Sequence, residues 1–178
     1  MNRGTKKFTN MNFSFLEDAD FWEKRLSALK TLASSQVDVG LTSSASARSR
    51  MLLAIHEHGA PAMRIPARPV IQPALSAETA RAEMAAAMTD AVSAALAGDE
   101  SAVMSSLESA GEAGIQAIRD YIDAGVPPPN APVTVTGGWV YNRAAKKGVH
   151  VEGKGFNKPL YDTGQLYHDF DCEIVSRS

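Results

Sequence analysis

The sequence predicts an α+β fold in which a small antiparallel or mixed sheet packs on a long antiparallel helix pair. Residues 76–98 and 99–125 place apolar side chains at the three- and four-residue spacings of amphipathic helices. Residues 36–42 and 170–175 instead alternate apolar and polar side chains, as half-buried strands do. Because helices and strands do not alternate regularly along the chain, the pattern favours α+β over a parallel α/β sheet.

Composition limits the broad class of protein. The chain has 178 residues, of which 44% are hydrophobic and 21% charged, with a formal net charge of -2. These values predict one modest globular domain and exclude an acidic disordered tail or a uniformly basic coat. No apolar run is long enough for a membrane span or a signal-peptide core, so no membrane contact is expected. The single cysteine, Cys172, is interpreted as a small buried side chain rather than a reactive thiol.

The chain divides into an N-terminal arm, residues 1–16, and a single domain, residues 17–178. The arm is polar with scattered aromatic residues. The domain is predicted to begin with a helix that Asp18 or Asp20 caps and that runs to about Ser34. Its apolar positions are Phe21, Trp22, Leu26, Leu29 and Leu32.

The segment between the first helix and the helix pair is predicted to be short and irregular. A strand at 36–42 is followed by a flexible Ser/Ala-rich loop at 43–49 and a short helix at 50–58 that ends at Gly59. Residues 65–73 contain three prolines, which remove hydrogen-bond donors. This stretch is therefore expected to be an edge strand or a rigid extended connector.

The two long helices have clear predicted ends. Ser76 is expected to cap the first helix, Gly98 to end it, Asp99 to cap the second and Gly125 to end that. The short link predicts antiparallel neighbours. The first predicted apolar stripe consists of Ala80, Met84, Met88, Ala91, Val92, Ala95 and Leu96. The second consists of Val103, Leu107, Gly111, Gly114, Ile115, Ile118 and Ile122.

Residues 133–155 are predicted to form a basic hairpin insertion. Strands at Val133–Thr136 and Trp139–Tyr141 would flank a Gly137-Gly138 turn, with Val149–Glu152 as a further strand. Residues 126–160 hold five cations against one glutamate, a net charge of +4, which leaves -6 for the rest of the chain. The cations are Arg143, Lys146, Lys147, Lys154 and Lys158.

The aromatic residues and the cations of this insertion invite different interpretations. Trp139, Tyr141 and Phe156 are candidate interface residues, and burial of Trp139 and Tyr141 in a neighbouring subunit is favoured over stacking on bases. The lysines are equally consistent with contacts to DNA phosphates and with a solvated loop.

Catalytic chemistry has little support in the sequence. His56 and His58 are two residues apart, so they point away from each other on a helix and lack zinc-site spacing. There is no nucleophile elbow and no phosphate-binding loop. The sequence therefore predicts a protein without enzymatic activity, metal or cofactor.

Three stretches in order resemble one family. Residues 52–75 contain Leu-Leu-Ala-Ile-His-Glu-His-Gly and Arg-Ile-Pro-Ala-Arg-Pro, residues 127–132 read Pro-Pro-Pro-Asn-Ala-Pro, and residues 158–166 read Lys-Pro-Leu-Tyr-Asp-Thr-Gly-Gln-Leu. They are similar to the phage tail-completion (neck) family, also called virion morphogenesis or putative minor tail component proteins. The matching positions are His56, Glu57, Gly59, Ile65, Pro66, Arg68, Pro69, Asp162, Thr163, Gly164 and Gln165.

The chain departs from the family pattern at some positions. His58 and Val70 stand where the family has aromatic residues, and the stretch from Trp139 to Gly155 is longer than expected. Arg68 is expected to pair with a carboxylate. The Asp162–Gln165 stretch has capping-box spacing and is expected to begin a short helical turn before the last strand.

The resemblance implies a structural virion protein: a ring-forming subunit at the head–tail neck that surrounds the DNA channel. A hexameric ring is expected, with a dodecamer as the alternative. The implied partners are further copies of the chain, the adjacent head–tail connector and tail terminator or tube proteins, and genomic DNA in the lumen. The subunit would occupy the host cytoplasm before it joins the virion. The alternative is a DNA-binding module that uses residues 143–158.

Overall fold

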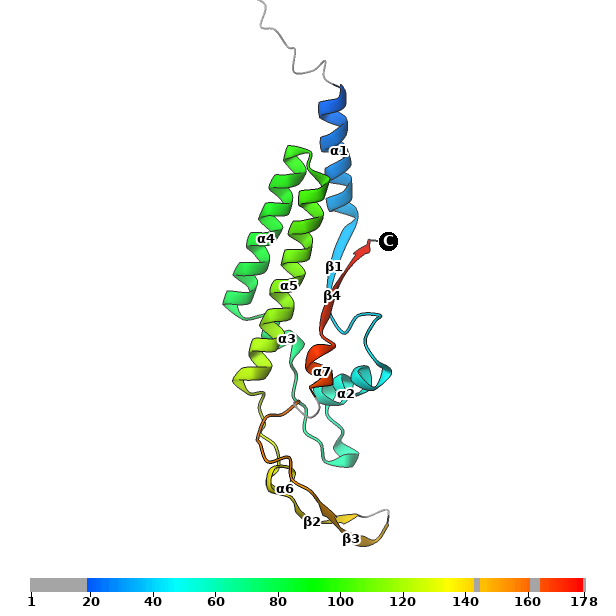
Figure 1. Cartoon of the computed structure of the whole chain (residues 1–178), viewed down its shortest axis with the longest axis vertical. Helices are drawn as coiled ribbons and strands as arrows, with labels where there is room; N and C mark the ends of the chain where they lie inside the picture. Colours follow the sequence, from blue (N-terminus) through cyan, green and yellow to red (C-terminus); the bar gives the residue numbers. More distant parts are fainter. Residues whose placement is uncertain (1–18, 143–144, 161–163, 178) are drawn as a thin grey trace, which may run out of the picture.

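The computed structural model describes residues 19–142, 145–160 and 164–177, so the predicted arm, Arg143, Asp162 and Thr163 lie outside the described residues. Figure 1 shows an elongated molecule with α1 at one end and the β2–β3 hairpin at the other. The helices are α1 (Ala19–Ser34), α2 (Ala47–His58), α3 (Ile71–Leu75), α4 (Glu78–Ala97), α5 (Glu100–Ala124), α6 (Pro132–Thr136) and α7 (Gln165–His168), with a 3-10 turn, η2 (Pro61–Met63). The strands are β1 (Ser35–Gly40), β2 (Gly138–Asn142), β3 (Lys147–Val151) and β4 (Asp171–Ser176).

The predicted α+β class is confirmed. Helices α4 and α5 form the long antiparallel pair, and α1 packs against both of them. Strands β1 and β4 pair antiparallel in the register Ser35↔Ser176 to Gly40↔Asp171, and this ribbon lies along α5. The second sheet, β2 with β3, projects at the far end (Figure 1). None of the described helices is long and apolar enough to cross a membrane.

The predicted ends of the helix pair are mostly confirmed. Gly98 ends α4 in the left-handed conformation, φ 83°, and Asp99 caps α5 by accepting a hydrogen bond from the Ala102 amide at 2.9 Å. The prediction that Ser76 caps α4 is wrong. Ala77 precedes α4 without a side-chain cap, because residues 71–75 already form α3 and Ser76 ends that helix.

The prediction for the middle segment needs two corrections. Helix α2 begins at Ala47 rather than Arg50, because the Ser46 hydroxyl accepts from the Ser49 amide at 3.0 Å and caps it. The proline-rich stretch is irregular only as far as Val70, and the residues that follow form α3. Proline is tolerated at the third position of α3 because the first-turn amides have no partner within the helix.

The prediction of which residues form the strands of the hairpin was also wrong. Val133–Thr136 belongs to α6, not to a strand, and Pro132 begins that helix with a backbone angle suited to it. Strand β2 pairs with β3 in the register Gly138↔Val151 to Asn142↔Lys147. The predicted strand near Val149–Glu152 is therefore real, and its partner is β2.

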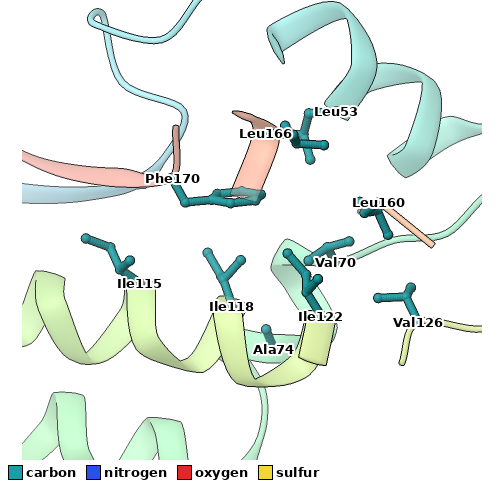
Figure 2. Packing of buried hydrophobic residues seen from close by; sticks show 10 residues of the cluster. All are labelled: Leu53, Val70, Ala74, Ile115, Ile118, Ile122, Val126, Leu160, Leu166 and Phe170. Carbon is teal, nitrogen blue, oxygen red and sulfur yellow. The ribbon is translucent and has the colours of Figure 1, made fainter. Parts of the chain in front are cut away.

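Within the described residues, two hydrophobic clusters form the core. Figure 2 shows the larger one, in which Phe170 lies over Ile118 of α5. It consists of Leu53, Val70, Ala74, Ile115, Ile118, Ile122, Val126, Leu160, Leu166 and Phe170. The second cluster joins α1, α4 and α5 through Ala28, Ala91, Ala95, Val103 and Leu107. Alanines at this contact allow the three helices to approach closely.

The predicted apolar stripes of α1 and α4 are only partly buried. The buried residues of α4 are Ala80, Ala91 and Ala95. The larger side chains Met88, Val92 and Leu96 are 40%, 45% and 57% exposed. On α1, Leu26 and Leu29 are likewise exposed, and Ala28 is the buried position. Helices α1 and α4 contribute buried alanines to their contact with α5, whereas α5 contributes the larger Val103 and Leu107.

Candidate functional site

The three motif stretches meet beside α2, where residues of all three line one hollow. Arg68, in the joint between the first two stretches, is only 6% exposed. The Arg68 Nε donates to the Pro128 carbonyl at 2.7 Å and Nη2 donates to the Pro129 carbonyl at 3.1 Å. The Arg68 backbone amide donates to the His56 carbonyl at 2.5 Å. Burial lowers the pKa of the guanidinium below its ordinary value.

The expected carboxylate partner of Arg68 is therefore replaced by two backbone carbonyls. The joint ties the connector that follows α2 to the proline segment that follows α5, about 60 residues later. The family-motif residue Arg68 acts here as a structural cross-link.

Glu57 connects α2 to α3. Its Oε1 accepts from the Val70 amide at 2.8 Å and from the Ile71 amide at 3.0 Å. These are amides at the start of α3, which cannot bond within the helix, and a negative charge there is favoured by the helix dipole. Glu57 therefore acts as a remote cap for α3.

Glu57→Ala is expected to lower the free energy of unfolding by about 1–3 kcal/mol, because it leaves two partly buried amides unpaired. Urea unfolding followed by circular dichroism measures this change. Glu57→Gln keeps an acceptor oxygen and should lose clearly less. Equal losses for the two variants would contradict the capping role.

His56, Lys154, Gly164 and Gln165 line a hollow of about 170 Å³ beside this joint, together with Asn130 and apolar residues of α2 and α7. The His56 Nδ1 and the Asn130 Nδ2 are buried without hydrogen-bond partners. Among the described residues, no group of three or more His, Cys, Asp or Glu side chains is placed to hold a metal ion.

The start of α7 differs from the predicted capping box. Gly164 is the N-cap residue and supplies no side-chain cap, so Gln165 is the first helical residue rather than the third. The Gln165 side-chain amide donates to Asp169, further along the chain. The predicted short helix is present, while the role expected of Asp162 lies outside the described residues.

The environment of His56 predicts a pH dependence of stability. Burial, followed by the charges of Arg68 and Lys154, lowers its pKa below 6.5, although Glu57 opposes this. Below about pH 6.5 the unfolded chain takes up a proton that the folded chain resists, so stability is full above that pH and falls as pH decreases. Urea midpoints at about pH 7.5 and 5.5 should differ less for His56→Gln than for the wild type. An unchanged difference in His56→Gln would contradict this account.

The hairpin exposes two of the three candidate interface residues together. Trp139 is 76% exposed and Tyr141 67% exposed, and as alternate residues of β2 they share one face. His150 of β3 lies opposite Trp139, with ring centroids 5.5 Å apart. Phe156, 39% exposed, lies outside the paired strands, in the segment that returns to the body.

The four described cations of the predicted basic set lie in three places. Lys146 and Lys147 are exposed where β3 begins, at the tip of the hairpin. Lys158 forms an ion pair with Asp123 at 3.2 Å, near the end of α5. Lys154 is half-buried and lines the hollow beside His56. The structure therefore does not gather these cations into one surface.

Sequence reasoning missed an acidic groove between α5 and β4. The groove has a volume of about 610 Å³ and is lined by Ile115, Phe170 and Cys172 and by the carboxylates of Glu112 and Asp171. Burial raises the pKa of the Cys172 thiol, and the negative charges of Asp171, Glu112 and Glu108 raise it further. The higher pKa keeps the thiol protonated and less reactive. The net charge of -6 outside the insertion was the available signal, but it did not locate the groove.

Comparison with known protein families, with curated proteins and with solved structures finds no match for the chain.

Proposed function

We propose that this protein is a non-enzymatic structural subunit of a tailed-phage particle, which assembles into a closed ring at the head–tail neck. The observation that carries the proposal is the β2–β3 hairpin, which stands away from the body with Trp139 and Tyr141 largely exposed (Figure 1). Large aromatic side chains on a projecting element are typical anchors of protein interfaces.

The joint between the motif stretches supports the same proposal. Arg68 and Glu57 use their polar atoms to hold backbone groups of the chain itself. Such residues stiffen a subunit and require no substrate. The motif stretches that resemble the neck family thus have a structural use in this fold.

The proposed ring is a hexamer, with a dodecamer as the alternative, and genomic DNA passes through its lumen. Its other partners are the adjacent head–tail connector and the tail terminator or tube proteins. The subunit is made in the host cytoplasm and resides in the virion. A subunit with a reaching hairpin at one end presents different surfaces to its two neighbours, as cyclic rings require.

Electron microscopy and native mass spectrometry of the full-length protein test the proposal. The expected result is a ring of six copies, and mass spectrometry of purified particles should detect the protein. A protein that remains monomeric at high concentration and is absent from particles would overturn the assignment.

A DNA-binding module is a second candidate, which the exposed Lys146 and Lys147 beside Tyr141 favour. If these lysines contact phosphates, Lys146→Ala/Lys147→Ala should weaken DNA binding and reduce the slope of log affinity against log salt by about 2. Lys158→Ala removes a lysine that is already paired with Asp123 and should change the slope less. Fluorescence anisotropy over a salt series measures this. Binding that is absent or independent of salt would exclude this candidate.

A further inference from the structure

The tip and one face of the β2–β3 hairpin form a basic, aromatic surface. Trp139 and Tyr141 lie on one face, and Lys146 and Lys147 lie at the tip. A lone two-stranded hairpin is only marginally stable in water, and exposed aromatic side chains make its solvation unfavourable. This surface is typical of one that becomes buried when a partner binds.

The groove between α5 and β4 has the complementary character. Its floor is formed by Ile115 and Phe170, which are 7% and 1% exposed, and by the half-buried Cys172. The exposed carboxylates of Glu112 and Asp171 line it. Glu108 lies one helical turn before Glu112 on α5, close to the groove. Its negative charge also raises the pKa of the Cys172 thiol. Arg119 also lines the groove, but its Nη2 donates to the Phe170 carbonyl at 3.2 Å.

The helix pair that borders the groove carries a net negative charge, and the hairpin carries a net positive charge. Residues 78–124, the helix pair, hold nine carboxylates against two arginines, a net charge of -7. Residues 138–151, the hairpin, hold three cations and no carboxylate, a net charge of +3. Opposite potentials on two different surfaces accelerate and orient association between copies.

The position of the hairpin favours a second copy over contact within one chain. Figure 1 shows the hairpin beyond the end of α5, whereas the groove residues 109–119 belong to the middle of that helix. Because hairpin and groove are different surfaces, one contact leaves the second copy's hairpin available for a third. Such a head-to-tail contact closes into a ring if the rotation permits.

We propose that the β2–β3 hairpin of one copy binds in the α5–β4 groove of a second copy. Lys146 and Lys147 face the exposed carboxylates of Glu108 and Glu112, and Trp139 and Tyr141 lie over the floor of the groove. This contact rests on the proposed ring function, since it is the repeating contact that builds the ring.

Charge reversal in the full-length protein tests the contact. Lys146→Glu/Lys147→Glu and, separately, Glu108→Lys/Glu112→Lys should each weaken self-association by about tenfold or more, because like charges then face each other. The chain carrying all four substitutions should recover most of the association. Mass photometry or sedimentation velocity measures the oligomer, and thermal unfolding checks that each variant is folded.

Glu83→Lys/Asp90→Lys on α4 is the matched control, because it reverses two exposed carboxylates away from the groove and should leave association unchanged. If the fourfold variant associates no better than the two double variants, the proposed contact is overturned. Rings that persist in every variant would also overturn the proposed contact but would remain consistent with the proposed ring function. A monomeric wild type would contradict both the contact and the ring function.

Photo-crosslinking identifies what the hairpin touches. Tyr141→p-benzoylphenylalanine in a mixture of isotopically light and heavy chains should link the hairpin to peptides from residues 108–119 or 171–175 of another copy. Links to residues 1–18, to another hairpin or to the exposed edge of α4 would overturn the proposal.

Discussion

Arg68→Ala is expected to lower the free energy of unfolding by about 3 kcal/mol. The substitution leaves the Pro128 and Pro129 carbonyls without their donors in a region where Arg68 is 6% exposed. The two hydrogen bonds are partly buried, so their loss costs roughly 1–3 kcal/mol in total, and the lost arginine also leaves a void. Urea unfolding monitored by circular dichroism measures the loss.

Two comparison variants separate the cross-link from a general effect of losing an arginine. Arg68→Lys keeps the charge but cannot reproduce the forked geometry, so it should recover only part of the stability. Arg50 also donates to carbonyls, those of Ser43 and Ala45, but it is exposed, and Arg50→Ala should cost about 1 kcal/mol or less. An Arg68→Ala protein as stable as the wild type would show that the joint does not depend on this side chain.

Gly111→Ala is expected to destabilise the protein by about 1–3 kcal/mol, although alanine is ordinarily favoured over glycine in a helix by about 1 kcal/mol. A Cβ at position 111 would lie 2.6 Å from the Cys172 Sγ and 2.7 Å from the Cys172 Cβ. The β1–β4 ribbon would have to move away from α5. Helix propensity predicts that the substitution stabilises the protein, and packing predicts that it destabilises it. The sign of the change in the free energy of unfolding therefore decides between the two effects.

Gly114→Ala serves as the comparison. A Cβ there would lie 3.1 Å from the two methyl groups of Val39, which can shift more easily than the Cβ of a paired strand. The loss should therefore be smaller than at Gly111. Equilibrium urea unfolding of both variants tests this, and a stabilised Gly111→Ala would contradict the close approach of ribbon and helix.

The same pair of residues shows where prediction from the sequence ends. Periodicity identified Gly111 as part of the apolar stripe of the second helix, and alternation identified the strand that contains Cys172. Their direct contact joins positions about 60 residues apart, which no local pattern specifies. The wrong interpretation of Val133–Thr136 has a related cause, because β-branched residues favour a strand while the preceding proline begins a helix.

By itself the sequence determined the long helix pair with its ends at Gly98, Asp99 and Gly125, the two strands of the ribbon, and the presence of a hairpin within residues 133–155 but not its strand pairing. These features depend on capping and periodicity within a few residues, so a short window contains the information. The tertiary structure alone decided the partners of Arg68, the capping of α3 by Glu57, and the acidic groove between α5 and β4. Those depend on which distant segments pack together, and that is set by burial over the whole chain rather than by local preference.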